Sequence, residues 1–244
     1  MTPTEKIATI VDIERFKKDG EVNFREYFVD NRFAMTEEMF KGKAVLDIGA
    51  NIGIFSLFAW AHGADPIFAV ESNAANYDKL CENTMKATGL VPLHFAAFNG
   101  VVKEASVTEG GGVSKIAPTI QLGGETVACK SLAELLEFMP PWDDMVLKVD
   151  VEGAEYDILL YAAAKEIRRF KTVFLETHRV FPGGPSPLEP RQARTAAYIV
   201  EYMQFLGYEI AKKDAYLWFE WDANGNTVGC TELPDQHSYR LERK

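Results

Sequence analysis

The stretch Asp47-Ile48-Gly49-Ala50-Asn51-Ile52-Gly53 decides the fold. Apolar residues 44–46 precede it and the apolar-rich segment 54–59 follows it, a pattern typical of a buried strand that enters a glycine turn and continues as a helix. A second apolar run, 66–70, ends at Glu71. The succession of strand, turn, helix and strand predicts an αβ unit of the kind that binds nucleosides.

The residue types in this turn indicate which ligand it suits. Gly49 and Gly53 let the backbone turn sharply and approach a ligand, and the amides at the start of the helix face the same place. Glu71 can accept hydrogen bonds from both hydroxyls of a ribose. The GxxxG spacing does not specify the pyrophosphate cradle of a GxGxxG turn, and Asp47 would repel a pyrophosphate but attract the ammonium and sulfonium of S-adenosylmethionine (SAM). We therefore favour SAM over a nicotinamide dinucleotide; a Rossmann-like turn with no ligand or with another nucleotide is the alternative.

Composition and charge narrow the function classes. The 244 residues fit one large α/β domain, and the net charge of −10 argues against a nucleic-acid or anionic-membrane partner. The mixed charges of residues 1–20 resemble neither a signal peptide nor a transit peptide, so a cytoplasmic enzyme is expected. No CxxC pair is present, which argues against a disulfide framework and a cysteine zinc site; the three cysteines are Cys81, Cys129 and Cys230.

From residue 44 onward, strand and helix patterns alternate, which predicts a largely parallel sheet covered on both faces. The capping-box pattern Ser131-Leu132-Ala133-Glu134 opens one further helix. An Asn224-Gly225 turn follows the last predicted strand. The predicted strands are 44–49, 66–72, 91–97, 145–151, 172–176, 208–211 and 216–221, and the main predicted helices are 53–62, 74–88, 155–166 and 192–206.

Three segments lie outside this alternation. Residues 1–40 have a helical pattern, and the sequence leaves open whether they cover the ligand site or pack on the sheet. Glycine and proline punctuate 99–126, which predicts hairpins or a loop insertion. The Pro/Gly-rich loop 181–190 comes soon after the strand at 172–176, so we expect it to overhang the substrate side and to help define acceptor specificity together with the insertion.

Four pieces of sequence, at the ends of four successive predicted strands, resemble the FkbM family of class I SAM-dependent methyltransferases. The pieces are 45–53, 70–73, 148–155 and 175–178, and the resemblance spans roughly residues 42–180. It implies an α/β fold with a Rossmann-like seven-stranded class I methyltransferase sheet, an antiparallel terminal hairpin and helices on both faces. Together with the helical pattern of residues 1–40, it predicts an N-terminal helical segment, 1–40, and a SAM-dependent methyltransferase domain, 41–244.

The activity that the resemblance implies is O-methylation of a hydroxyl on a small or carrier-linked metabolite, such as a sugar, a glycan or a natural product, with SAM as the cofactor. Asp47 and the amides near Gly49 and Asn51 would hold the methionine part of SAM, and Glu71 its ribose hydroxyls. The full set of predicted cofactor-binding residues is Asp47, Gly49, Asn51, Gly53, Glu71, Asn73 and Ala97, the last two beside the adenine. Two departures from the family pattern are Ser72, where proline is usual, and the segment 97–100.

The predicted catalytic residues are Asp150 and His178, either of which can accept the proton of an acceptor hydroxyl. Asp150 lies at the carboxyl edge of the sheet, where ligands bind in open α/β folds, and His178 has an ordinary pKa of about 6.5. The residues predicted to contact the substrate are Glu152, Glu176 and Arg179. Asp150, Glu152, Glu176 and His178 could instead hold magnesium or manganese, but nothing in the sequence fixes an octahedral set, so metal-free catalysis is expected.

Two other functions stay open at this point. One is N-methylation of a peptide or amine, for which the acids at 150 and 152 would form an acidic acceptor pocket. The other is a SAM-binding module without catalysis that serves as a partner or scaffold. The expected partner is a small-molecule or carrier-linked hydroxylated acceptor, with no nucleic acid and no membrane, and a homodimer is an open option.

Overall fold

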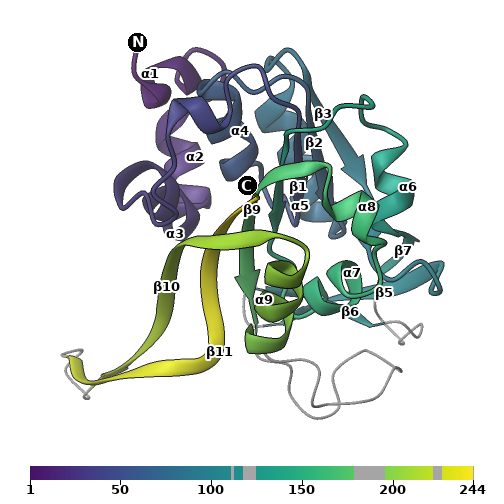
Figure 1. Ribbon diagram of the computed structural model, residues 1–244. Helices are drawn as coiled ribbons and strands as arrows, with labels where there is room; N and C mark the ends of the chain where they lie inside the picture. Colours follow the sequence, from purple (N-terminus) through teal and green to yellow (C-terminus); the bar gives the residue numbers. More distant parts are fainter. Residues whose placement is uncertain (111–112, 118–124, 179–195, 222–226, 244) are drawn as a thin grey trace.

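The computed structural model describes residues 1–110, 113–117, 125–178, 196–221 and 227–243 and contains a seven-stranded sheet (Figure 1). Its strand order is β10-β11-β9-β8-β1-β2-β3. Neighbouring strands from β9 to β3 are parallel, whereas β11 runs antiparallel to both β9 and β10. This order confirms the predicted Rossmann-like sheet with a terminal hairpin. The strands are β1 (Val45–Ile48), β2 (Ile67–Glu71), β3 (Leu90–His94), β8 (Met145–Val149), β9 (Phe170–Thr177), β10 (Tyr208–Trp221) and β11 (Thr227–Arg243).

Helices cover both faces of the sheet, as predicted (Figure 1). Because side chains alternate along a strand, Val45 and Val146 enter one hydrophobic core and Leu46 and Leu147 enter the other. The first core lies under α1 (Pro3–Ile7), α2 (Ile13–Asp19), α3 (Glu21–Phe24), the π-helical turn Arg25–Val29, the 3₁₀ turn Glu37–Met39, α4 (Ile54–Ala61) and α5 (Ala74–Thr84). The second lies under α6 (Leu132–Leu136), α7 (Glu155–Leu159), α8 (Ala164–Ile167) and α9 (Ala196–Phe205).

The N-terminal segment packs on the sheet rather than standing apart from it. Ile7, Phe16 and Tyr27 are buried in the core shared with α4 and β1. Tyr27 stands edge-on to Phe55 of α4, with ring centroids 5.5 Å apart. The division of the chain at residue 40 therefore stays a prediction, because hydrophobic contacts continue across it. Within the described ranges, no helix has both the length and the apolar character needed to cross a membrane.

A smaller sheet accounts for the described part of the glycine-rich insertion. Its strands are β4 (Ala96–Ala97), β5 (Glu104–Gly110), β6 (Val113–Ala117) and β7 (Glu125–Lys130), in the order β4-β7-β5-β6. β5 is antiparallel to both β6 and β7, which confirms the predicted hairpins. The capping box at Ser131 and Glu134 is also confirmed, with the Glu134 amide 3.2 Å from Ser131 Oγ.

Two predicted elements differ from the structure. The predicted helix 155–166 is broken into α7 and α8, because Ala163 adopts an extended conformation and caps α8, where its amide donates to Glu166 at 2.9 Å. The predicted separate strands 208–211 and 216–221 form the single strand β10, whose pairing with β11 shifts register twice across the polar stretch between them. Such shifts interrupt the alternation by which a strand is recognised. The predicted turn at Asn224-Gly225 and the loop 181–190 lie outside the described residues.

Candidate cofactor and acceptor site

The residues predicted to carry chemistry meet at the carboxyl edge of the sheet, on the face covered by the N-terminal helices and α4. Val146 and Phe174 belong to the core of that face. Residues at even intervals from them keep this orientation, which places Lys148, Asp150 and Glu176 on the same face. Parallel strands present their carboxyl ends at one edge, so the ends of β1, β2, β8 and β9 together form the candidate site.

The glycine turn adopts the conformation that its sequence predicts. Gly49, Asn51 and Gly53 all have positive φ, at 83°, 52° and 93°. The turn is fastened to β2 because the amides of Gly49 and Ala50 both donate to the Val70 carbonyl at 2.9 Å. Asn51 is exposed at the tip of the turn, where its side chain is accessible to a ligand.

Glu71 lies beneath this turn at the end of β2 and is 5% exposed. Its two oxygens accept hydrogen bonds of 2.8 Å from the amides of Asn51 and Asn73. Burial raises the pKa of Glu71, and the two amide hydrogen bonds partly offset that rise. Each carboxylate oxygen has a second lone pair, so both can still accept a hydroxyl. The placement fits the predicted ribose contact, which stays a prediction.

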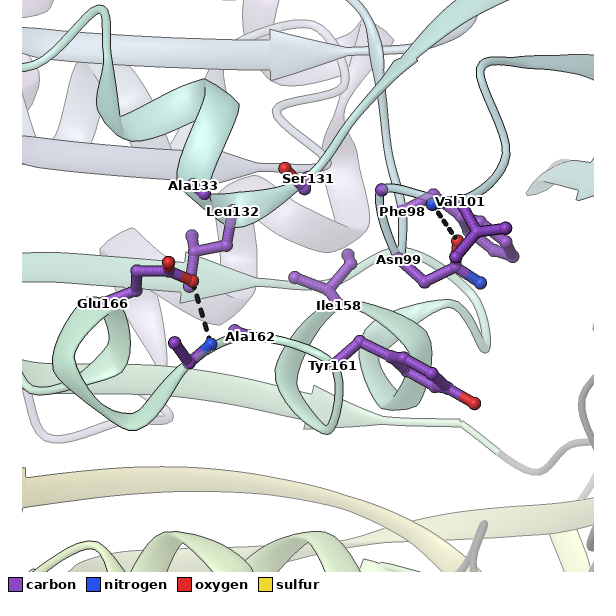
Figure 2. A pocket seen from close by; sticks show the side chains of 12 residues that line it. Phe98, Asn99, Val101, Ser131, Leu132, Ala133, Ile158, Tyr161, Ala162 and Glu166 are labelled. Carbon is purple, nitrogen blue, oxygen red and sulfur yellow. Dashed lines mark hydrogen bonds between the residues drawn. The ribbon is translucent and has the colours of Figure 1, made fainter.

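The two residues predicted beside the adenine are both buried. Asn73 caps α5, where its side chain accepts from the Asn76 amide at 2.9 Å, and Ala97 pairs with Lys130 in the small sheet. A pocket of about 350 Å³ begins immediately after Ala97, and Figure 2 shows Asn99 and Tyr161 among its walls. None of the predicted cofactor residues themselves lines this pocket.

Asp47 is completely buried under the turn, where it belongs to a charged row that crosses β1 and β8. Its Oδ2 accepts from Ser56 Oγ at 2.6 Å, and its Oδ1 lies 3.4 Å from Lys148 Nζ. Lys148 also donates to the Gly49 carbonyl at 2.7 Å and lies 3.3 Å from Asp150 Oδ2. Burial alone would lower the pKa of Lys148, but Asp150 and Asp47 hold it above its ordinary value. This row supports the turn from below, and direct contact between Asp47 and a ligand stays a prediction.

His178 stands among four carboxylates and is 7% exposed. Its Nε2 lies 3.4 Å from Glu176, 3.6 Å from Glu152 and 3.7 Å from Asp150, and its Nδ1 lies 3.5 Å from Glu155. Burial alone would lower the pKa of His178, but these acids, Glu155 foremost, hold it well above the ordinary value. Burial would raise the pKa of Asp150, yet Lys148 and His178 leave it lowered. The four predicted residues Asp150, Glu152, Glu176 and His178 are thus brought together.

Glu155, at the start of α7, holds the end of β9 in place. Its Oε1 accepts from the His178 amide at 2.6 Å and its Oε2 accepts from the Gly153 amide at 2.8 Å. The Tyr156 hydroxyl donates to the His178 carbonyl at 3.3 Å. These bonds fix the backbone of His178 relative to the β8–α7 turn.

The N-terminal segment brings a further ion pair close to this edge. Arg32 pairs with Glu26 in the π-helical turn, and both side chains are largely buried. Burial and the nearby carboxylate of Glu176 raise the pKa of Glu26 to about 7. Burial likewise raises the pKa of Glu152 to about 7, although His178 opposes the rise. Several carboxylates are thus crowded into one weakly hydrated region.

Three of the carboxylate and imidazole groups are close enough to share a cation. Asp150, Glu176 and His178 each offer one ligand atom, and these atoms all lie within 4.8 Å of one another. The predicted substrate residue Arg179 lies outside the described residues. The roles of the predicted catalytic, cofactor and substrate residues stay predictions.

Sequence reasoning missed four residues that shape the site. Lys148 carried a signal, because a lone charge inside the apolar strand 145–149 requires a buried partner. Glu155 belongs to the segment 148–155 that resembles the family, but the sequence indicates no role for it. Glu26 and Arg32 carried no signal, because only the tertiary fold brings the N-terminal segment to this edge.

The family model described as "Methyltransferase FkbM domain" matches residues 47–210. The hexuronic acid methyltransferase AglP of Haloferax volcanii is 29% identical over 129 residues, which cover 51% of this chain and 52% of that protein. The chain thus matches about half the length of this relative.

Solved structures resemble the fold at low sequence identity. A putative hemolysin from Lactococcus lactis gives a TM-score of 0.50 at 13% identity, with 92% of this chain and 88% of that chain covered. The precorrin-6y C5,15-methyltransferase of Geobacter metallireducens gives a TM-score of 0.46 at 14% identity, with 86% and 87% covered. At 13% identity, the likeness to the hemolysin structure shows a similar fold and nothing about function.

Proposed function

Because the chain belongs to the FkbM methyltransferase domain family, we propose that it is a methyltransferase that transfers the methyl group of SAM to a hydroxyl of a sugar-containing acceptor. The proposed acceptor is a hexuronic acid unit, either free or linked to a carrier. The proposal of a uronic acid draws on the name of the AglP relative. Two expectations from the sequence stay predictions: that the protein has no nucleic-acid or membrane partner, and that it is cytoplasmic. A homodimer stays an open option.

The observation that carries the SAM part is the pairing of Glu71 with the glycine turn. The buried carboxylate of Glu71, at the end of β2, lies directly beneath the exposed residue Asn51. It accepts a hydrogen bond of 2.8 Å from the backbone N–H of Asn51. Ribose hydroxyls are recognised by an acid at this place in open α/β sheets, and the backbone amides of the turn can receive the amino-acid carboxylate. The excess of carboxylates further along the edge favours the positive sulfonium.

The reaction is an in-line displacement. The acceptor oxygen forms a bond to the methyl carbon while the bond from that carbon to sulfur breaks, and S-adenosylhomocysteine leaves with the electron pair. Holding the two reactants in contact contributes about 7–11 kcal/mol to lowering the barrier, and a group that accepts the hydroxyl proton adds about 10² to 10⁴ in rate. Asp150 and His178 are the residues expected at this hydroxyl.

The experiment that tests the proposal supplies methyl-labelled SAM with glucuronic acid, its nucleotide-linked form and hexuronic-acid oligosaccharides. We expect label in a uronic acid acceptor together with formation of S-adenosylhomocysteine. Alkaline treatment separates the products, because a methyl ester is hydrolysed and the expected methyl ether is not. Label that is lost in alkali, or label found only on amine acceptors, would contradict O-methylation of a hydroxyl.

N-methylation is the second candidate, and the acid cluster is the observation that favours it. An ammonium group could take the place that Asp150, Glu152 and Glu176 provide beside His178. A set of amine acceptors run beside the uronic acids decides between the two. A SAM-binding module without catalysis would bind SAM but form no S-adenosylhomocysteine with any acceptor in the set.

Replacing Glu71 by Gln should weaken SAM binding about tenfold to a hundredfold in isothermal titration. A hydrogen bond to a charged group contributes about 1.5–3 kcal/mol, and about 1.4 kcal/mol corresponds to a tenfold change in Kd. The matched control is Glu125→Gln, because Glu125 also accepts a backbone amide at the start of α5, from Ala74 at 3.1 Å, but is exposed.

A 2′-deoxyribose analogue of SAM makes this test specific for the ribose. It should bind the original protein more weakly than SAM does, whereas Glu71→Gln should bind the two ligands almost equally. Equal losses of affinity for SAM and its analogue in Glu71→Gln would show that Glu71 does not contact the ribose.

A further inference from the structure

We propose that Asp150, Glu176 and His178 form a binding site for a divalent cation, Mn²⁺ or Mg²⁺, and that the cation holds the acceptor hydroxyl during methyl transfer. The three side chains project from the ends of β8 and β9 into one space. Binding of the ion is independent of the substrate, whereas its part in the reaction rests on the proposed function.

The distances suit a single ion with small adjustments. The three ligand atoms lie within 4.8 Å of one another, with Nε2 of His178 3.4 Å from Glu176 and 3.7 Å from Asp150. Ligands of an octahedral ion at about 2.1 Å are about 3.0 Å apart when adjacent and about 4.2 Å apart when opposite. Two carboxylates and one imidazole suit Mn²⁺ well, because it accepts both oxygen and nitrogen ligands. Three protein ligands would leave positions for water and for an acceptor oxygen.

The state of His178 is a second and independent sign of a missing ligand. The ring is largely buried, and its Nδ1, which faces Glu155 at 3.5 Å, makes no hydrogen bond of ordinary length with the described residues. Nε2 faces three carboxylates at 3.4 to 3.7 Å, longer than the usual N–H···O bond of about 2.9 Å. Leaving a buried polar ring so poorly bonded costs free energy.

A cation at Nε2 would resolve this arrangement. Metal-bound histidines commonly donate their other ring N–H to a carboxylate, which fixes the tautomer and the ring position. Glu155 is already placed for this role, with its Oε1 3.5 Å from Nδ1 of His178, and its own position is set by two backbone amides. The structure therefore holds both the ligand atoms and the group that would orient the imidazole.

The charge balance of the surroundings favours a divalent cation. Within the described ranges, the permanent cations near the cluster are Lys148 and Arg32, and Arg32 is paired with Glu26. Lys148 takes one oxygen of Asp150, which leaves the other oxygen turned toward His178. The carboxylates at this edge are Glu26, Asp47, Asp150, Glu152, Glu155 and Glu176.

In the proposed reaction the cation acts as a Lewis acid on the acceptor. A hydroxyl bound to the ion loses its proton more easily. Asp150 and His178 then act as ligands of the ion, and Glu152, which lies beside them, takes their place as the group that accepts the proton and passes it to solvent. The oxygen then forms its bond to the methyl carbon as the carbon–sulfur bond breaks. The ion is neither oxidised nor reduced.

The test is titration of the metal-stripped full chain with Mn²⁺, followed by electron paramagnetic resonance without SAM. We expect a single bound ion per chain that Mg²⁺ displaces. Glu176→Gln and His178→Gln should each weaken binding about tenfold or more. The control Glu137→Gln removes an exposed carboxylate at the C-terminal end of α6 and should leave the affinity for Mn²⁺ unchanged. Circular dichroism and unfolding in urea establish that the variants are folded.

The outcomes separate this inference from the proposed function. Absence of Mn²⁺ binding at millimolar concentration overturns the site, and so does equal weakening by Glu137→Gln, which would indicate ions scattered over an acidic surface. Mn²⁺ binding without any SAM binding leaves the site standing and contradicts the proposed function. Full methyl transfer in the presence of a chelator, with SAM bound normally, overturns the catalytic part. Methylation of amine acceptors by a protein that binds no Mn²⁺ would assign the cluster to an ammonium group instead.

Discussion

Replacing Lys148 by Met should lower the free energy of unfolding by about 3–5 kcal/mol, as expected when one partner of a buried ion pair is removed. Lys148 is 3% exposed and lies between Asp47, which is completely buried, and Asp150. Without the ammonium group, Asp47 keeps only its hydrogen bond from Ser56, and the Gly49 carbonyl loses its donor. Unfolding in urea followed by circular dichroism measures the loss.

Two controls make the Lys148 result specific. Lys103→Met removes an ammonium whose side chain is 66% exposed and paired with Glu134. Such surface pairs contribute about 0–1 kcal/mol, so this variant should unfold close to the original protein. Combining Lys148→Met with Asp47→Asn should recover part of the loss, because it removes one of the carboxylates left unpaired. Equal stability of the Lys148 and Lys103 variants would contradict a supporting role for the buried row.

Gly49→Ala should both destabilise the protein and abolish measurable SAM binding. A Cβ atom at this position would lie 1.8 Å from the Asp150 carbonyl oxygen and 2.9 Å from its carbon, and both belong to the backbone of the neighbouring strand end. In addition, the positive φ of 83° lowers the free energy of unfolding by about 1–2 kcal/mol when the residue has a side chain. The turn must move away from Asp150 to relieve the overlap, and this movement destabilises the protein by about 1–3 kcal/mol more.

Gly42 and Gly207 provide matched comparisons for this substitution. Both have positive φ, at 68° and 97°, but a Cβ atom at either position would meet nothing within 4 Å. Their alanine variants should therefore show only the conformational cost in urea unfolding and should bind SAM normally in isothermal titration. If Gly49→Ala resembled these two variants in both measurements, close approach of the turn to β8 would have no part in ligand binding.

Much of the fold could be predicted because its signals are local. The apolar runs that became β1, β2 and β8 each end within one residue of an acidic residue, which is Asp47, Glu71 or Asp150. The polar interruption 212–214 concealed the length of β10, because its register shifts are fixed by pairing with β11 and not by its own pattern. The sequence predicts a single helix over 155–166, because no residue in it signals the extended conformation of Ala163.

The site residues that could be predicted from the sequence are those at or next to the ends of predicted strands. Asp150 and Glu176 follow from alternation along their strands, and their shared face follows from parallel pairing. The orientation of His178 depends on Glu155, a contact made through three-dimensional packing between α7 and β9. Glu26 reaches the same edge only because the N-terminal helices pack over α4, which no local pattern specifies.

The position of β11 has a consequence for how the protein is made. β11 is last in the sequence but lies between β9 and β10, pairing with β9 from Glu242 to His237. During synthesis, β9 therefore emerges from the ribosome long before β11 has been made. Until then, the N–H and C=O groups on the β11 side of β9 have no strand to pair with. An exposed strand edge is a template for aggregation. A chain shortened before residue 237 would keep β9 open permanently, so we expect nascent or truncated forms to depend on chaperones far more than the finished sheet does.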